Sequence, residues 1–201
     1  TTAIPPLYLE KDCALLFFGL AKNFKEEVLP SIRKYILDVN PYCDIYAHTY
    51  NIHAVTNPRN EENNTSVYPL EVYFLTNNVA LDTLESASKF IDFQYYHKFN
   101  LSNTVGFISM DNMIKEWYSV ERVWNSTKPF HYKRLGLFRL DVQYQEPINI
   151  SHGDAVVPNF QHFGLVNDRA FYGLRKYAKI WATTRFSQVE AQAKRNHNDL
   201  R

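Results

Sequence analysis

The chain has few of the residues that build the common nucleotide-binding and hydrolytic motifs. Only six of its 201 residues are glycine, and these six do not cluster. The phosphate-binding loop Gly-x-x-x-x-Gly-Lys-Ser/Thr and the three-glycine dinucleotide fingerprint are both absent, which argues against ATP hydrolysis and hydride transfer. The serine and zinc hydrolase signatures Gly-x-Ser-x-Gly and His-Glu-x-x-His are absent as well.

Cysteine is equally scarce. Cys13 and Cys43 each stand at the start of a predicted strand, and neither has an evident histidine partner in the sequence. We interpret them as two buried thiols in preference to a disulfide framework or a metal site. The two cysteines therefore do not indicate whether the chain resides in an oxidising or a reducing compartment. Asn-x-Ser/Thr triplets would accept glycans only in a secretory lumen and do not fix the compartment; they begin at Asn63, Asn64, Asn100, Asn125 and Asn149.

An excess of one charge and long apolar runs are also missing. The chain has 22 basic and 21 acidic residues, a formal net charge of +1, which disfavours nucleic acid and anionic membranes as partners. No segment has the apolar length of a membrane span, and no charged-then-apolar leader stands at the amino end. We expect a soluble chain, with the cytoplasm slightly favoured over a Golgi-lumenal domain cut from its anchor.

What the sequence does contain is an alternation of strand and helix patterns. The apolar run Ala14–Leu20 predicts a strand covered on both faces. An apolar stripe from Val28 to Val39 predicts a helix, and Cys43–Thr49 predicts a second strand that completes a right-handed βαβ unit. With 45% hydrophobic residues, the chain is long enough for one core, so we expect a single α/β domain over residues 1–201, with a mostly parallel sheet flanked by helices.

The rest of the chain continues this pattern. The polar, Asn-rich stretch from Tyr50 to Pro69 predicts a mobile surface loop. Apolar periodicity predicts further strands and helices, and Asn167 or Asp168 is the expected cap of the last helix. The predicted strands are Glu71–Thr76, Val105–Ser109 and Ala155–Val157, and the predicted helices are 81–91, 110–126 and 171–181. Residues 187–201 are a polar tail.

The stretch Leu135–Tyr144 is an apolar run that ends by presenting Arg139 and Asp141. Alternate residues of a strand share a face, so the two side chains should lie together. In open α/β sheets the ligand crevice lies beyond the carboxyl ends of the strands. Two interpretations stay open: Asp141 binds Mg²⁺ or Mn²⁺ at the phosphates of a nucleotide-sugar, or the two residues form a structural ion pair.

A series of short segments resembles the GT-A type of nucleotide-sugar glycosyltransferase. The segments are Leu16–Phe24, Asp44–Tyr50, Met113–Trp124, Leu137–Tyr144, Val157–Phe160 and Val166–Gly173. Together they extend from about Ala14 to Arg185. The resemblance implies a Rossmann-like GT-A fold in which residues 14–109 bind the nucleotide and residues 110–186 bind the metal, the donor sugar and the acceptor.

The resemblance also implies roles for individual residues. In that family an Arg-x-Asp or Asp-x-Asp at the end of a central strand holds the metal and the donor diphosphate, which corresponds to Arg139 and Asp141. Asp168 is the candidate base, and His162 is a candidate further ligand of Mn²⁺ or Mg²⁺. With arginine at the first position, metal dependence stays open. The candidate donor-binding residues are Gly19, Lys22, Asn23, His48, Tyr50, Arg139 and Arg169.

The leading hypothesis is therefore an enzyme that moves a sugar from a nucleoside diphosphate donor to a hydroxyl of a glycan or glycoprotein. A second hypothesis is a non-catalytic carbohydrate-binding or assembly module on the same fold. A third, a glycoside hydrolase, requires a second acid across a cleft from Asp141. The sequence does not distinguish donor sugar, base, acceptor or stereochemistry.

Overall fold

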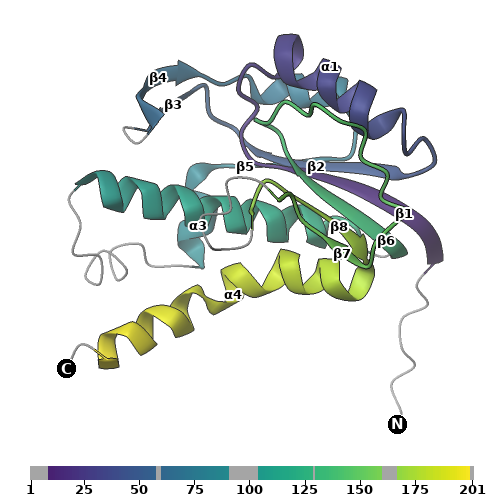
Figure 1. Ribbon diagram of the computed structural model, residues 1–201. Coiled ribbons are helices and arrows are strands. Elements are labelled where there is room, and N and C mark those ends of the chain that lie inside the picture. The colour runs from purple at the N-terminus through teal and green to yellow at the C-terminus, as the bar shows by residue number, and fades with distance from the viewer. Residues whose placement is uncertain (1–8, 58–59, 91–103, 129, 160–166, 200–201) are drawn as a thin grey trace.

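A computed structural model describes residues 9–57, 60–90, 104–128, 130–159 and 167–199. Its centre is a six-stranded, mostly parallel sheet with helices on both faces (Figure 1). The strands β5, β2, β1 and β6 are parallel, β8 runs antiparallel to β6, and β7 runs antiparallel to β8. The expected α/β class is confirmed. In spatial order the strands are β5 Val79–Asp82, β2 Asp44–Tyr50, β1 Leu9–Phe18, β6 Phe130–Arg139, β8 Ala170–Leu174 and β7 Ala155–Val156.

Strand β1 occupies the centre of the sheet because its residues are apolar on both faces. Ala14 to Phe18 have no exposed surface. Leu15 and Phe17 pack into one core cluster, and Leu16 and Phe18 pack into the other, as the alternation of a strand requires. The predicted strand at residues 14–20 is confirmed, although it begins earlier, at Leu9, and ends at Phe18.

One face of the sheet is covered by the helical segment that follows β1. It consists of η1 Phe24–Val28, α1 Leu29–Ile32 and η2 Arg33–Leu37, which lie above the sheet in Figure 1. Phe24, Val28, Ile32 and Ile36 are buried on its inner side. The predicted helix is confirmed, and Pro30 stands at the start of α1, where the backbone changes from the π-helical turn of η1 to an α-helical turn.

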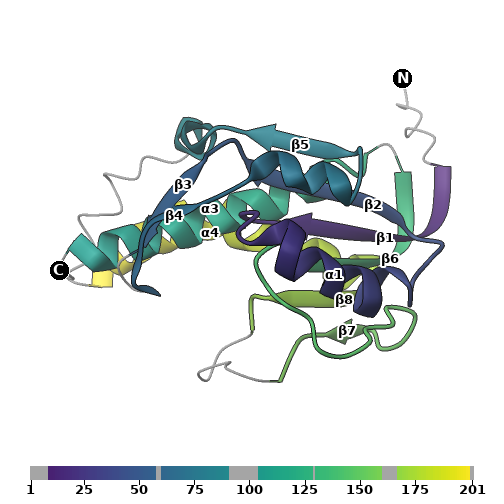
Figure 2. The same cartoon turned by 90° about the horizontal axis from the view of Figure 1, so that it is seen from above.

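The other face is covered by two long helices, α3 Thr104–Asn125 and α4 Arg175–Asp199, which lie side by side in Figures 1 and 2. Val120 and Trp124 of α3 and Ala178 and Trp181 of α4 pack against this face. The predicted helix at 110–126 is confirmed but begins at Thr104. The strand predicted at residues 105–109 is therefore wrong, because a short apolar run fits a strand and a buried helix turn equally well.

Two other predictions in the first half of the chain are wrong. Residues 71–76 do not form a strand, because a 3₁₀ helix, η4 Pro69–Phe74, begins at the proline. The stretch 50–69, expected to be a loop, contains an antiparallel hairpin of β3 Ala54–Asn57 and β4 Glu62–Ser66. β4 is entirely polar and β3 has only two adjacent apolar residues, so neither strand has the apolar alternation from which it could be predicted. The predicted helix at 81–91 reduces to η5 Leu84–Lys89 within the described residues.

The pattern at residues 171–181 divides into two elements. Phe171 and Leu174 belong to strand β8, and α4 begins only at Arg175. Neither Asn167 nor Asp168 is therefore the helix cap. Asn167 accepts a hydrogen bond from the backbone N–H of Arg169 at 2.9 Å instead. The polar segment after residue 187 continues α4 as far as Asp199. Among the described residues, no helix combines the length and the apolar character needed to cross a membrane.

Cys13 and Cys43 form a disulfide, so the interpretation as two thiols is wrong. Cys13 lies in β1 and Cys43 directly precedes β2, and their Cα atoms are 4.8 Å apart. The reason is strand register: Ala14 pairs with Asp44, which places the preceding residues side by side. A sequence pattern predicts the two strands but not their register.

We predict that replacing both cysteines, Cys13→Ser with Cys43→Ser, lowers the free energy of unfolding by about 3 kcal/mol. The bond joins residues 30 positions apart and restricts the unfolded chain accordingly. Denaturant unfolding with and without a reducing agent measures the effect. The unfolding free energy of the wild type should fall on reduction, and that of the double variant should not change. Equal stability of both proteins, with and without the reducing agent, would contradict the prediction.

Candidate functional site

The strand order marks one place where a ligand site is expected. The chain passes from β1 outward to β2 and β5, then returns to the other side of β1 as β6. The direction of winding therefore reverses between β1 and β6. Ligands of open α/β sheets bind beyond the carboxyl ends of the strands at such a switch point. β1 ends at Phe18, which is paired with Arg139 at the end of β6.

The turn after β1 leaves the backbone open at this position. Gly19 has a positive φ of 100°, and no atom lies within 4 Å of the position a Cβ would occupy. Its N–H donates to Ser119 Oγ at 3.0 Å, which fixes the turn against α3. Asn23, in the left-handed conformation with φ 47°, is exposed and leads into η1. A ligand can approach the main chain closely here.

Lys22 points from this turn toward two carboxylates. Its Nζ lies 2.6 Å from Glu62 Oε1 and 3.7 Å from Asp141 Oδ2. Glu62 comes from β4, so this ion pair attaches the β3–β4 hairpin to the end of β1. Only 19% of the Lys22 side chain is exposed. The predicted donor-binding lysine thus lies at the switch point, with anionic partners already in place.

Arg139 and Asp141 meet at the end of β6, as the sequence predicts. Arg139 donates from Nε to Asp141 Oδ1 and from Nη2 to Oδ2, both at 2.8 Å, in a bidentate ion pair. Its Nη1 donates to Glu116 Oε2 of α3 at 3.0 Å. Lys22, Glu62, Glu116, Arg139 and Asp141 will be called the switch-point cluster. The cluster brings together residues from the turn after β1, from β4, from α3 and from the end of β6.

The charges of Arg139 and Asp141 stabilise each other. Burial alone would raise the pKa of the Asp141 carboxyl, but the adjacent Arg139 guanidinium and the Lys22 ammonium hold that pKa below its ordinary value. Burial likewise opposes the charge of Arg139, and Asp141 and Glu116 more than compensate, so its pKa is raised. Both side chains are therefore ionised at neutral pH.

Glu116 differs from the other carboxylates of the cluster. Burial, together with the nearby charges of Asp168 and Asp141, raises its pKa to about 7, although Arg139 and Arg185 oppose the rise. Its Oε1 atom is buried and accepts no hydrogen bond within the described part of the chain. A carboxyl group with a pKa near neutrality is a frequent feature of functional sites. Glu116 could not be singled out from the sequence, because it lies inside helix α3, which is recognised by the spacing of its apolar residues.

Asp168 and Arg169 precede β8 at the same edge of the sheet. Asp168 is partly exposed and interacts electrostatically with Glu116, Arg139 and Arg185. The carbonyl oxygen of Arg169 accepts the backbone N–H of Arg139 at 3.2 Å. The structure thus brings the predicted base to the cluster, from the strand next to β6.

His48 and Tyr50, two of the candidate donor-binding residues, both lie in the protein interior. His48 is fully buried between Ser119 Oγ, 2.6 Å from Nδ1, and Asp82 Oδ2, 3.2 Å from Nε2. Tyr50 is 2% exposed and donates its hydroxyl to Lys115 O. The Ser–His–Asp contacts resemble a hydrolase triad in composition. Because Ser119 and His48 have no exposed surface, a substrate cannot reach them, and we interpret them as a structural network.

The Asp141 carboxylate, the predicted metal ligand, is already occupied by cationic side chains. Both oxygens of Asp141 accept hydrogen bonds from Arg139, and Lys22 lies on the same carboxylate. Mg²⁺ and Mn²⁺ require free oxygen ligands. Within the described ranges no group of three or more His, Cys, Asp or Glu side chains is arranged to hold a metal. The predicted ligand His162 lies outside the described residues.

No family model matches the chain, and a search of curated proteins finds no significant match. The function is therefore inferred from the geometry of the switch-point cluster.

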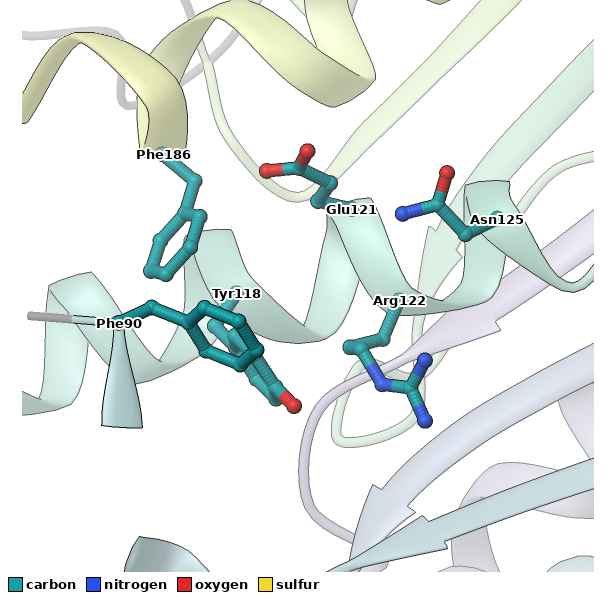
Figure 3. Close-up of a pocket in the computed structure, with 6 residues that line it drawn as sticks. All are labelled: Phe90, Tyr118, Glu121, Arg122, Asn125 and Phe186. Carbon is teal, nitrogen blue, oxygen red and sulfur yellow. The ribbon is translucent and has the colours of Figure 1, made fainter. Parts of the chain in front are cut away.

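Away from the switch-point cluster, a hollow lies between α3 and the neighbouring helices (Figure 3). Phe90 stacks on Tyr118 with ring centroids 6.0 Å apart, and Phe186 of α4 meets Tyr118 edge-on at 5.3 Å. The volume of about 180 Å³ is below the roughly 300 Å³ at which small-molecule pockets begin. We therefore base the function on the switch-point cluster. The hollow is lined by Phe90, Tyr118, Glu121, Arg122, Asn125 and Phe186.

We predict that Glu116→Gln changes how stability depends on pH. Glu116 binds its proton more tightly in the folded chain, with a pKa of about 7, than in the unfolded chain, where 4.5 is ordinary. The stability that this proton contributes is present below about pH 4.5 and is lost as the pH rises through 7. Between pH 5 and pH 7 the unfolding free energy of the variant should therefore gain about 2 kcal/mol relative to the wild type.

Denaturant unfolding at pH 5, 6 and 7 measures this difference. The matched control is Glu146→Gln, which neutralises an exposed carboxylate. Its unfolding free energy should follow that of the wild type. Parallel curves for the wild type and Glu116→Gln would show that Glu116 is ionised throughout this range.

Proposed function

We propose that the chain is a nucleotide-sugar-dependent glycosyltransferase of the GT-A kind, which moves a sugar from a nucleoside diphosphate donor to a hydroxyl of a glycan or glycoprotein. The observation that carries the proposal is the pair of cations at the switch point. Lys22 and Arg139 both lie against the Asp141 carboxylate, at the carboxyl ends of β1 and β6. A diphosphate leaving group needs positive charge at that place.

The donor diphosphate would lie over the end of β1, where Gly19 leaves the backbone accessible. Lys22 would meet a phosphate oxygen as a point charge, after releasing Glu62. Two anions, the carboxylate and the phosphate, thus compete for one ammonium group. Donor binding would consequently loosen the ion pair that holds the β3–β4 hairpin to this edge. The hairpin is the element best placed to respond to the donor.

Arg139 would act from the cluster without leaving it. Its bidentate bond to Asp141 and its bond to Glu116 fix the guanidinium at the strand end. A fixed positive charge stabilises negative charge that develops on the leaving diphosphate without any reorganisation at the moment of reaction. Glu116 is in this account a positioning residue for Arg139. The phosphate charge is met by protein cations, and no step requires a metal.

Asp168 remains the candidate for the base in an inverting transfer. Its side chain is partly exposed, so an acceptor hydroxyl can approach it. The competing candidate, Glu116, has the more suitable pKa of about 7, but its Oε1 atom is buried. Its greater accessibility supports Asp168 over Glu116 as the proposed base.

One observation favours the non-catalytic alternative, a carbohydrate-binding or assembly module. Arg139 is already bonded to two carboxylates, and Lys22 is close to two more oxygens from Glu62 and Asp141. Cations that are already paired attract a phosphate less strongly. The two functions differ in turnover: a transferase releases nucleoside diphosphate from a donor in the presence of an acceptor, and a binding module does not.

We predict opposite effects on donor affinity for the two partners of one ion pair. Lys22→Met should weaken binding about 10- to 100-fold, because a hydrogen bond to a charged group is worth about 1.5–3 kcal/mol. Glu62→Gln should strengthen binding several-fold, because it removes the competing anion. Calorimetric titration with UDP- and GDP-sugars, in the presence of EDTA and again with Mn²⁺, measures both.

The outcome separates three cases. Opposite signs for the two variants support a phosphate at Lys22, and equal or absent effects mean that the ion pair only holds the hairpin. Failure of every donor to bind the wild type would exclude the transferase. A screen of the same donors for release of nucleoside diphosphate, with glycan acceptors, then distinguishes the enzyme from the binding module.

A further inference from the structure

The segment around Asn149 presents its side chain at the surface while its backbone is held in place. Asn40, which is buried, donates from Nδ2 to the carbonyl of Ile148 at 2.7 Å and accepts the N–H of Ile150 at 3.0 Å. Ile150 is 2% exposed and packs in the core. Between these two anchored residues, Asn149 is exposed, as is Ser151. Asn149, Ile150 and Ser151 form an Asn-x-Ser triplet.

The side chain of Asn149 is also oriented by its own triplet. Its Oδ1 accepts the backbone N–H of Ser151 at 2.9 Å. This bond uses the carbonyl oxygen and not Nδ2, the nitrogen to which an N-linked sugar is attached. A surface loop is the setting in which such a triplet can carry a bulky glycan without disturbing the fold.

The position is compatible with the proposed donor site. The two neighbours of Asn149, Ile148 and Ile150, are bonded to Asn40, which stands four residues before β2, at the amino ends of the parallel strands. The switch-point cluster lies at the carboxyl ends of β1 and β6. A glycan on Asn149 would therefore leave the donor site open.

The disulfide is an independent observation that concerns the compartment. Cys13 and Cys43 are oxidised to one bond, and there is no free cysteine in the chain. Structural disulfides persist in secreted proteins and in the lumen of the secretory pathway, whereas the cytosol keeps thiols reduced. N-linked glycans are added in the same pathway. Both features point to one environment, and against the cytoplasm that the sequence slightly favoured.

We propose that the chain folds in the oxidising lumen of a secretory pathway and that Asn149 carries an N-linked glycan there. The triplet at Asn125 serves as the internal contrast. Thr127, its hydroxyl residue, is 1% exposed and donates to Trp124 O at 2.8 Å, and Asn125 lines the hollow beside α3. A glycan would be hindered there, so Asn125 should be unmodified.

The first test uses the natural protein, isolated from the cells that make it. Free thiols are alkylated without reduction, N-glycans are removed by a glycosidase in heavy-oxygen water, and peptides are analysed by mass spectrometry. We expect an isotope-labelled aspartate at position 149 and a Cys13–Cys43 peptide pair without alkylation. Unlabelled Asn149, or alkylated cysteines, would overturn the proposal.

The second test uses the full chain secreted from eukaryotic cells behind a cleavable leader. Ser151→Ala removes the hydroxyl that the triplet needs but keeps the backbone N–H that Asn149 binds, so the fold is preserved. This variant and Asn149→Gln should each lose one glycan. On a gel each should migrate faster than the wild type, and glycosidase treatment should shift its band less than it shifts the wild-type band. Asn125→Gln should migrate with the wild type. A glycan that survives in Ser151→Ala, or that is lost in Asn125→Gln, contradicts the assignment.

Discussion

The bonds of Arg139 to Asp141 and Glu116 hold the functional edge of this protein together. They connect the end of β6 to the middle of α3, and through Asp141 they reach Lys22 in the turn after β1. All three side chains of the two ion pairs are mostly buried. Removing Arg139 would take the nearest cation away from two mostly buried carboxylates, which is costly in a medium of low polarity.

The rest of the fold supplies the rigid frame for this arrangement. The carboxyl end of β1 is tied to α3 by the bond from Gly19 to Ser119, and Ser119 is in turn bonded to His48 of β2. Burial lowers the pKa of His48, although Asp82 opposes this, so the imidazole is neutral and serves as a hydrogen-bonding link. The disulfide joins the middle of β1 to the residue just before β2. The switch point thus has fixed strands on both sides and a charged, partly open surface above it.

Much of the sheet and the position of the candidate site could be predicted from the sequence. Local patterns can be recognised in a sequence. Two of them are the apolar run of β1 and the charged residues Arg139 and Asp141 at the end of the apolar run of β6. The features that could not be predicted depend on residues far apart in the chain. The cysteine pairing follows from strand register, and Glu62 and Glu116 join the cluster only when a polar hairpin and a helix pack against the sheet edge.

The secondary-structure predictions for the short apolar segments were wrong for a different reason. Residues 105–109 and 171–174 have compositions that suit a strand or a buried helix, and only the packing around them selects one. Asp168 was predicted to be either a cap or a base, and the first role disappeared when β8 was found between it and α4. The position of Asp168 beside the cluster leaves the second role as a hypothesis.

A crystal structure of the chain with a bound nucleoside diphosphate, UDP or GDP, tests the central claim most directly. The account predicts that the diphosphate lies over Gly19 between the ends of β1 and β6, with Lys22 moved from Glu62 to a phosphate oxygen and Arg139 still bonded to Asp141. A nucleotide bound elsewhere on the molecule, with the Lys22–Glu62 ion pair intact, would contradict it.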